Sequence, residues 1–92
     1  MRAIITVLGG DKVGIIYNVT KIVAEYNINI LDISQTVMGE SIFTMLMFVD
    51  MSDMTCTFRE LALSLDALAQ DFGVSIRVQR EDVFNAMHSI QG

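Results

Sequence analysis

The sequence predicts an α+β fold in which four strands and two helices follow one another in the order βαββαβ. Runs rich in β-branched residues predict the strands, and apolar residues at helical spacing predict the helices. Proline is absent, so Gly, Asn and Asp mark the boundaries between them. Right-handed connections place both helices on one face of a four-stranded antiparallel sheet, which is the ferredoxin-like plan.

The first quarter of the chain predicts a strand, a glycine loop and a helix. Residues 3–8 are rich in Ile, Thr and Val, which favour a strand. We expect Gly9 and Gly10 to let the backbone turn sharply after it and approach another group closely. Apolar residues recur at helical spacing from residue 15 to residue 26, and Asn27 can adopt the left-handed conformation that ends a helix.

The second quarter predicts a hairpin of two long strands. Residues 28–38 form the first, and a change of apolar phase between Ile30 and Leu31 indicates a bulge. Residues 39–41 are short enough for a hairpin turn. Residues 42–49 are apolar at nearly every position, which is typical of a central strand covered on both faces.

The second helix has clear boundary signals. Residues 51–56 read as a loop, and Thr57 with Glu60 three residues later has the form of a capping box. The apolar face of this helix runs to Phe72, and Gly73 ends it.

The last strand and a C-terminal helix complete the chain. Apolar and polar residues alternate over residues 74–79, which predicts a half-buried strand. Apolar residues at helical spacing predict a short helix over residues 82–90, with Phe84, Met87 and Ile90 on its apolar face. We expect one domain over residues 1–80, extended by residues 81–92.

Composition favours a small homodimer in the cytoplasm. The chain has 92 residues, of which 52% are apolar, and such a surplus indicates burial against a second copy. A net charge of −5, with few Lys and Arg residues, argues against binding to nucleic acid or anionic membranes. The longest apolar run, residues 45–49, is far too short to span a membrane. A single cysteine, Cys56, excludes an internal disulfide.

Other functions of this fold lack their characteristic residues. An RNA-binding module would carry stacking aromatic residues in a basic setting, and a metal carrier would have two cysteines in the first loop. A phosphatase would need Arg and Asn residues around a phosphate, whereas Lys12 is the only cation in that loop. There is no Ser/His/Asp set, and His88 has no second ligand at helical spacing. We therefore expect no enzyme activity, no metal and no cofactor.

One stretch carries a family resemblance. The segment LGGDKVGII, followed by a helix that ends EYNINI, resembles the ACT domain, and the resemblance covers residues 2 to about 79. The segment DISQTV, residues 32–37, fits the second strand of single-ACT-domain proteins similar to the regulator of the glycine cleavage system. The resemblance implies a module that binds a small effector, commonly an amino acid, at an interface between two copies.

The resemblance also implies where the effector lies. It places the effector between the first loop of one copy and Asn29 of the other, and the loop residues are Gly9, Gly10, Asp11, Val13, Gly14 and Ile15. Some amino-acid-binding members carry His at the position of Gly9 and Asn at that of Asp11, and many carry Pro at that of Val13.

The chemistry of the loop suits a zwitterion. Gly14 leaves the first-turn amides of the helix uncovered, which favours a carboxylate, and Asp11 can accept from an ammonium group. Asp11 can equally be the N-cap of the helix, Asn29 a strand-start hydrogen bonder, and Lys12 a solvated charge. Two functions remain open: a regulatory module that senses a small molecule and signals to a partner protein, and an assembly module without a metabolite. Whether Lys12 or Gln35 touches a ligand is also open.

Overall fold

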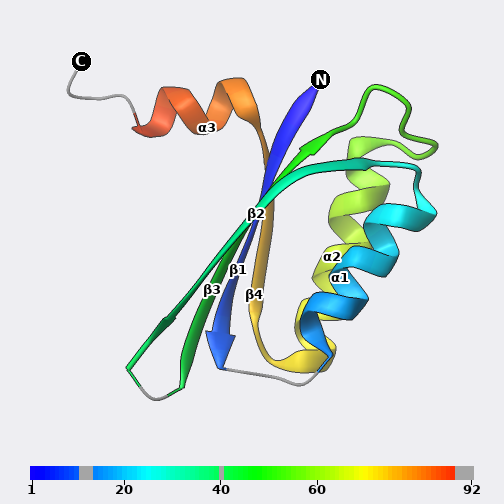
Figure 1. Cartoon of the computed structure of the whole chain (residues 1–92). Coiled ribbons are helices and arrows are strands. Elements are labelled where there is room, and N and C mark those ends of the chain that lie inside the picture. Colours follow the sequence, from blue (N-terminus) through cyan, green and yellow to red (C-terminus); the bar gives the residue numbers. More distant parts are fainter. Residues whose placement is uncertain (11–13, 40, 89–92) are drawn as a thin grey trace.

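The described part of the chain forms one four-stranded antiparallel sheet with three helices (Figure 1). The computed structural model describes residues 1–10, 14–39 and 41–88. The elements are β1 (Arg2–Gly10), α1 (Ile15–Glu25), β2 (Asn29–Met38), β3 (Ile42–Asp50), α2 (Phe58–Phe72), β4 (Ser75–Arg80) and α3 (Glu81–His88). The strand order is β2-β3-β1-β4, and α1 and α2 cover the same face. The predicted ferredoxin-like βαββαβ fold is confirmed.

The main core lies between this face and the two helices. Alternate residues of β1 and β3 point into it, since successive side chains of a strand face opposite sides. The buried residues include Ile5 and Val7 of β1, Met45 and Met47 of β3, Val19 and Val23 of α1, and Leu61 and Leu65 of α2. The spacing of four residues within each helix keeps these side chains on one stripe.

Local signals set the ends of the helices as the sequence predicts. Asn27, which follows the C-cap residue Tyr26 of α1, has a φ of 58°. The capping box of α2 is complete, because the Glu60 amide donates to Thr57 Oγ1 at 3.0 Å and the Thr57 amide donates to Glu60 Oε1 at 2.8 Å. Gly73 is the C-cap of α2 with a φ of 68°.

The expected sharp turn at Gly9 and Gly10 is wrong. Both residues belong to β1, where they pair with Phe43 and Ile42 of β3. The expected close approach is confirmed at Gly9, because a Cβ added there would lie 2.6 Å from Val74 Cγ1. The chain entering β4 therefore passes too close to β1 for a side chain at this position.

The β2–β3 pair differs from the prediction on one point. The bulge is confirmed, since the register shifts between Ile30 and Asp32 and leaves Leu31 unpaired. The central position of β3 is also confirmed. Coverage of both its faces is wrong: the residues that face α1 and α2 are buried, whereas Leu46 and Phe48 on the opposite face are only half-buried.

The third helix lies on the side of the sheet opposite α1 and α2 (Figure 1). It begins at Glu81, directly after β4, and contacts β1 and β4. Arg2 Nε donates to Glu81 Oε1 at 3.0 Å, which ties its first turn to β1. Phe84 is half-buried, and the predicted contributions of Met87 and Ile90 to its apolar face lie outside the described side chains. No helix in the described ranges is long and apolar enough to cross a membrane.

Candidate functional site

Among the described residues, no side chain caps the amides at the beginning of α1. Gly14 is the N-cap, with φ 86° and ψ −3°, so Asp11 does not hold that position. A glycine has no side chain with which to accept from the first-turn amides, and no acidic residue stands in that turn. Asn18 donates from Nδ2 to the Gly14 carbonyl at 2.8 Å, and the same carbonyl accepts from the Asn18 backbone amide at 3.0 Å. Free amides at a helix N-terminus favour an anion.

The other predicted loop residues contribute in different ways. The Ile15 side chain is buried in the core and is not available to a ligand. Gly9 and Gly10 end the strand that leads to the loop. Asp11, Lys12 and Val13 lie outside the described residues.

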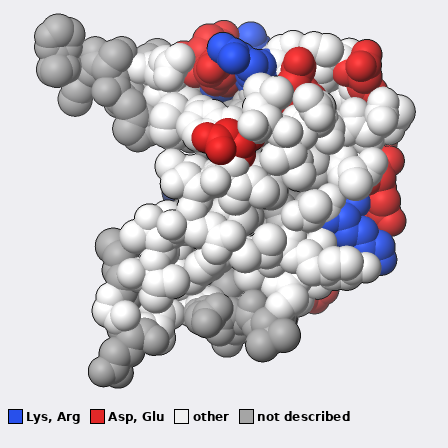
Figure 2. All heavy atoms as spheres, in the orientation of Figure 1, with Lys and Arg blue, Asp and Glu red and all other residues white. Residues whose placement is uncertain are grey.

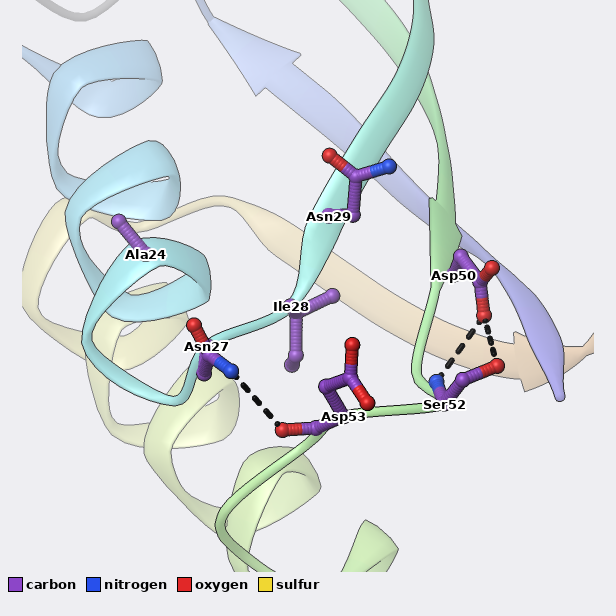
Figure 3. A pocket seen from close by; sticks show the side chains of 7 residues that line it. All are labelled: Ala24, Asn27, Ile28, Asn29, Asp50, Ser52 and Asp53. Atoms are coloured by element: carbon purple, nitrogen blue, oxygen red, sulfur yellow. Dashed lines mark hydrogen bonds between the residues drawn. The ribbon is translucent and has the colours of Figure 1, made fainter.

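Asn29 lies in a polar pocket at the other end of the sheet (Figure 3). It is exposed and is the first residue of β2. The pocket has a volume of about 500 Å³ and is lined by Ala24, Asn27, Ile28, Asn29, Asp50, Ser52 and Asp53. The pocket forms because the end of α1, the start of β2 and the loop after β3 meet here.

Hydrogen bonds organise the floor of this pocket. Ser52 donates to Asp50 Oδ1 from its hydroxyl at 2.6 Å and from its amide at 2.9 Å, and these bonds hold the pKa of Asp50 below its ordinary value. The ammonium group of Met1 lies 3.9 Å from the same oxygen. Asn27 donates from Nδ2 to the Asp53 carbonyl at 3.1 Å. These contacts fix the loop after β3 and leave the side-chain amide of Asn29 facing solvent.

The loop and Asn29 are far apart within one chain. Gly10 pairs with Ile42, whereas Asn29 pairs with Asp50 at the opposite end of β3. Eight residues of extended strand span roughly 26 Å. Figure 1 shows the same separation, with the start of α1 and the start of β2 at opposite ends of the sheet. One copy therefore supplies the two predicted halves of a site but does not bring them together.

The described residues show no apparatus for catalysis or metal binding. No group of three or more His, Cys, Asp or Glu side chains in these ranges could hold a metal ion. Burial, and then the nearby charge of Glu60, raise the pKa of Cys56, so this thiol stays protonated at neutral pH. The Gln35 side chain is exposed on β2.

Sequence reasoning missed Asp50, Ser52 and Asp53 as pocket residues. Their order, DMSD, carries an available signal, since Asp followed two residues later by Ser is typical of a turn closed by a side chain. The sequence does not show that this turn lies beside Asn29, because that depends on the β2–β3 register.

Comparisons with known proteins show which family the chain belongs to. A family model described as ACT domain matches residues 2–79. A UPF0237 protein of Listeria monocytogenes is 48% identical over 90 residues, which cover 98% of this chain and 100% of the relative. A UPF0237 protein of Clostridium acetobutylicum is 51% identical with the same coverage.

Solved structures show the same fold. An ACT domain protein from Streptococcus pneumoniae superposes with a TM-score of 0.77 at 43% identity, over 96% of this chain and 98% of that chain. A glycine cleavage repressor-like ACT protein superposes with a TM-score of 0.70 at 26% identity, over 86% of this chain and 44% of that chain.

Proposed function

Because the chain belongs to the ACT domain family and to its UPF0237 proteins, we propose that it is a regulatory module that binds a small molecule. The small molecule is an amino acid, and it binds between two copies of the chain. The loop before α1 of one copy and Asn29 of the other form the site. A separate partner protein receives the signal when the ligand changes the interface between the two copies.

The observation that carries the proposal is the N-terminus of α1, which no side chain of the described residues caps. The same chain closes α2 with a full capping box but begins α1 at Gly14, which has no side chain. An amino-acid carboxylate is the anion that suits these amides. Asp11 is included because of its place in the sequence, and its carboxylate would accept from the ammonium group of the amino acid.

The free edge of β2 supports the two-copy arrangement. This strand is ten residues long and pairs only with β3. Leu31, Ile33 and Val37 are exposed along it, which invites pairing with another strand. Antiparallel pairing of β2 with the β2 of a second copy places that copy's Asn29 beside Met38. Because Met38 pairs with Ile42 and Ile42 with Gly10, Asn29 then lies at the end where α1 begins.

A thermal-shift screen of the common amino acids tests for a ligand. A ligand at 100 times its dissociation constant stabilises the folded state by about 2.7 kcal/mol, so the melting temperature should rise for one or more of them. A flat response at millimolar concentrations would instead favour an assembly module without a metabolite.

Complementation between two variants then tests the site. Gly14→Val crowds the helix amides, and Asn29→Ala removes the facing carboxamide, so calorimetry should detect no binding to either homodimer. A mixture that exchanges subunits contains heterodimers with one intact site, so binding should return at up to half the sites in each heterodimer.

The control for Gly14→Val is Gly73→Val, because Gly73 has the same left-handed backbone at φ 68° but lies at the end of α2. Both variants carry the strain of a branched residue in this conformation, and only Gly14→Val should lose the ligand. A ligand that binds both site variants as tightly as the parent protein places the site elsewhere.

A further inference from the structure

A recess opens on the face of the sheet opposite α1 and α2, beside the start of α3. It has a volume of about 300 Å³ and is lined by Arg2, Ala3, Leu31, Asp32, Phe48 and Glu81. Figure 2 shows a hollow on the left of the molecule, between α3 above and the β2–β3 hairpin below. Small-molecule sites have volumes of roughly 300–1,000 Å³, so the recess suits a ligand of the size of one amino acid. It shares no lining residue with the pocket beside Asn29.

The strand register places opposite charges on two sides of an aromatic residue. Phe48 of β3 pairs with Asp32 of β2 on one side and with Ile4 of β1 on the other. Arg2 stands two positions before Ile4 and therefore points to the same face of the sheet. Phe48 is half-buried, and Leu31, the unpaired residue of the bulge, is exposed. The recess thus has a cation on β1, an anion on β2 and an apolar surface between them.

Arg2 is held in place and keeps donors for a second carboxylate. Its Nε donates to Glu81 Oε1 at 3.0 Å, and in the described part of the chain its two Nη groups donate to no protein atom. Asp50, the residue opposite Arg2 on β3, already accepts two hydrogen bonds from Ser52. The two Nη groups of a guanidinium can bind both oxygens of one carboxylate. The cation of the recess is therefore positioned and still has a free fork of donors.

Asp32 is also oriented, and it keeps one oxygen for a ligand. Its Oδ1 accepts from the Ile33 amide at 3.0 Å, which holds the carboxylate against the backbone of β2. Among the described residues, no group donates to Oδ2. A group that is fixed before the ligand arrives loses less conformational freedom on binding.

We propose that this recess binds an apolar α-amino acid in its zwitterionic form. The carboxylate of the ligand accepts from the Nη groups of Arg2, and its ammonium group donates to Asp32 Oδ2. The apolar side chain lies on Phe48 and Leu31. A plain carboxylic acid leaves Asp32 unmatched and a plain amine leaves Arg2 unmatched, so the zwitterion fits best. This site lies within one chain and does not depend on the site between two copies proposed above.

Calorimetry with L-leucine and two analogues tests the class of ligand. 3-Methylbutylamine has the same apolar group without the carboxylate, and 4-methylpentanoate has it without the ammonium group. Each analogue should bind about ten- to a hundredfold more weakly than leucine, because it lacks one charge-assisted hydrogen bond. The measurement is made at low ionic strength, since Arg2 and Asp32 are exposed. An analogue that binds as tightly as leucine overturns recognition of a zwitterion.

Two variants with matched controls test the site. Asp32→Asn keeps the Oδ1 that accepts from Ile33 and removes the charge, so leucine should bind about ten- to a hundredfold more weakly. Arg2→Gln should have the same effect. Glu81→Gln is its control, because it breaks the ion pair of Arg2 but leaves the guanidinium, and it should keep the affinity for leucine. Asp66→Asn, at an exposed aspartate of α2, is the control for Asp32→Asn. Circular dichroism checks that each variant is folded.

Gly14→Val separates this site from the one at the start of α1, because Gly14 does not line the recess. The recess is the leucine site if Gly14→Val binds leucine like the parent protein, whereas Asp32→Asn and Arg2→Gln do not. If only Gly14→Val loses leucine, the recess is overturned and the site at α1 stands. Loss in all three variants overturns a separate site. Loss in only one of Asp32→Asn and Arg2→Gln overturns the zwitterion. Unchanged binding in both, or no binding of millimolar leucine to the parent protein, overturns the recess site.

Discussion

The contact between Gly9 and Val74 makes Gly9→Ala a sharp test of the packing. A Cβ at position 9 would lie 2.6 Å from Val74 Cγ1, 2.9 Å from Val74 Cβ and 3.2 Å from Val74 Cα. The last of these is a backbone atom, so rotation of the Val74 side chain cannot relieve the whole overlap. The start of β4 has to move away from β1.

Two opposing effects set the size of the loss. Forced overpacking costs about 1–3 kcal/mol. Replacing a strand glycine by alanine returns about 0.5–1 kcal/mol, because the unfolded chain loses freedom. We expect Gly9→Ala to lower the free energy of unfolding by about 0–2.5 kcal/mol. For a domain of this size, each kcal/mol lowers the melting temperature by about 4–8 °C.

Urea denaturation of a double-mutant cycle measures the effect. Val74→Ala removes Cγ1 but keeps Cβ and Cα, so it should reduce the loss caused by Gly9→Ala without abolishing it. The reasoning is refuted if Gly9→Ala stabilises the protein, or if its cost is the same with Val74 and with Ala at position 74.

The remaining predictions concern a helix cap, a carboxylate and a thiol. Thr57→Ala should lower the free energy of unfolding by about 0.5–2 kcal/mol in urea denaturation, because it breaks the capping box of α2; an unchanged midpoint would contradict this. Because the hydrogen bonds from Ser52 lower the pKa of Asp50, they should stabilise the fold fully above the ordinary aspartate pKa of about 3.9. This stabilisation should be lost as the pH falls through the lower pKa that Asp50 has in the folded protein. Melting curves of Ser52→Ala should therefore approach those of the parent in acid, and a constant difference would disprove it. Cys56 should react with iodoacetamide at pH 7 more slowly than in urea, since burial raises its pKa; equal rates would exclude protection.

The sequence predicts best those features that depend on residues close together in the chain. The capping box of Thr57 and Glu60 and the bulge at Leu31 follow from spacing within a few residues. The turn expected at Gly9 and Gly10 is wrong, and the sequence could not name Val74 as the group that Gly9 approaches, because the two residues are not neighbours in the chain. Val74, more than sixty positions away in the chain, approaches β1 in three dimensions, and a pair of glycines in a row looks the same for a turn and for a close contact.

The same distinction between local signals and contacts of distant residues applies to the candidate site. Gly14 is correctly placed at the start of α1, because a glycine before a periodic apolar run is a local signal. The pocket beside Asn29 needs Asp50, which reaches it only through pairing of β2 with β3. Exposure of one sheet face is likewise invisible in the run of apolar residues in β3, because Leu46 and Phe48 are as apolar as the buried residues between them.

The separation of the two half-sites has a consequence for regulation. If the ligand contacts Gly14 of one copy and Asn29 of another, no single chain can hold it with both groups. Ligand binding and association are then linked, and each strengthens the other by the same free energy. A ligand at 100 times its dissociation constant adds about 2.7 kcal/mol per site to the assembled state, or about a hundredfold in the association constant. A chain of 92 residues can in this way convert a metabolite concentration into a change of assembly state, which a partner protein can recognise.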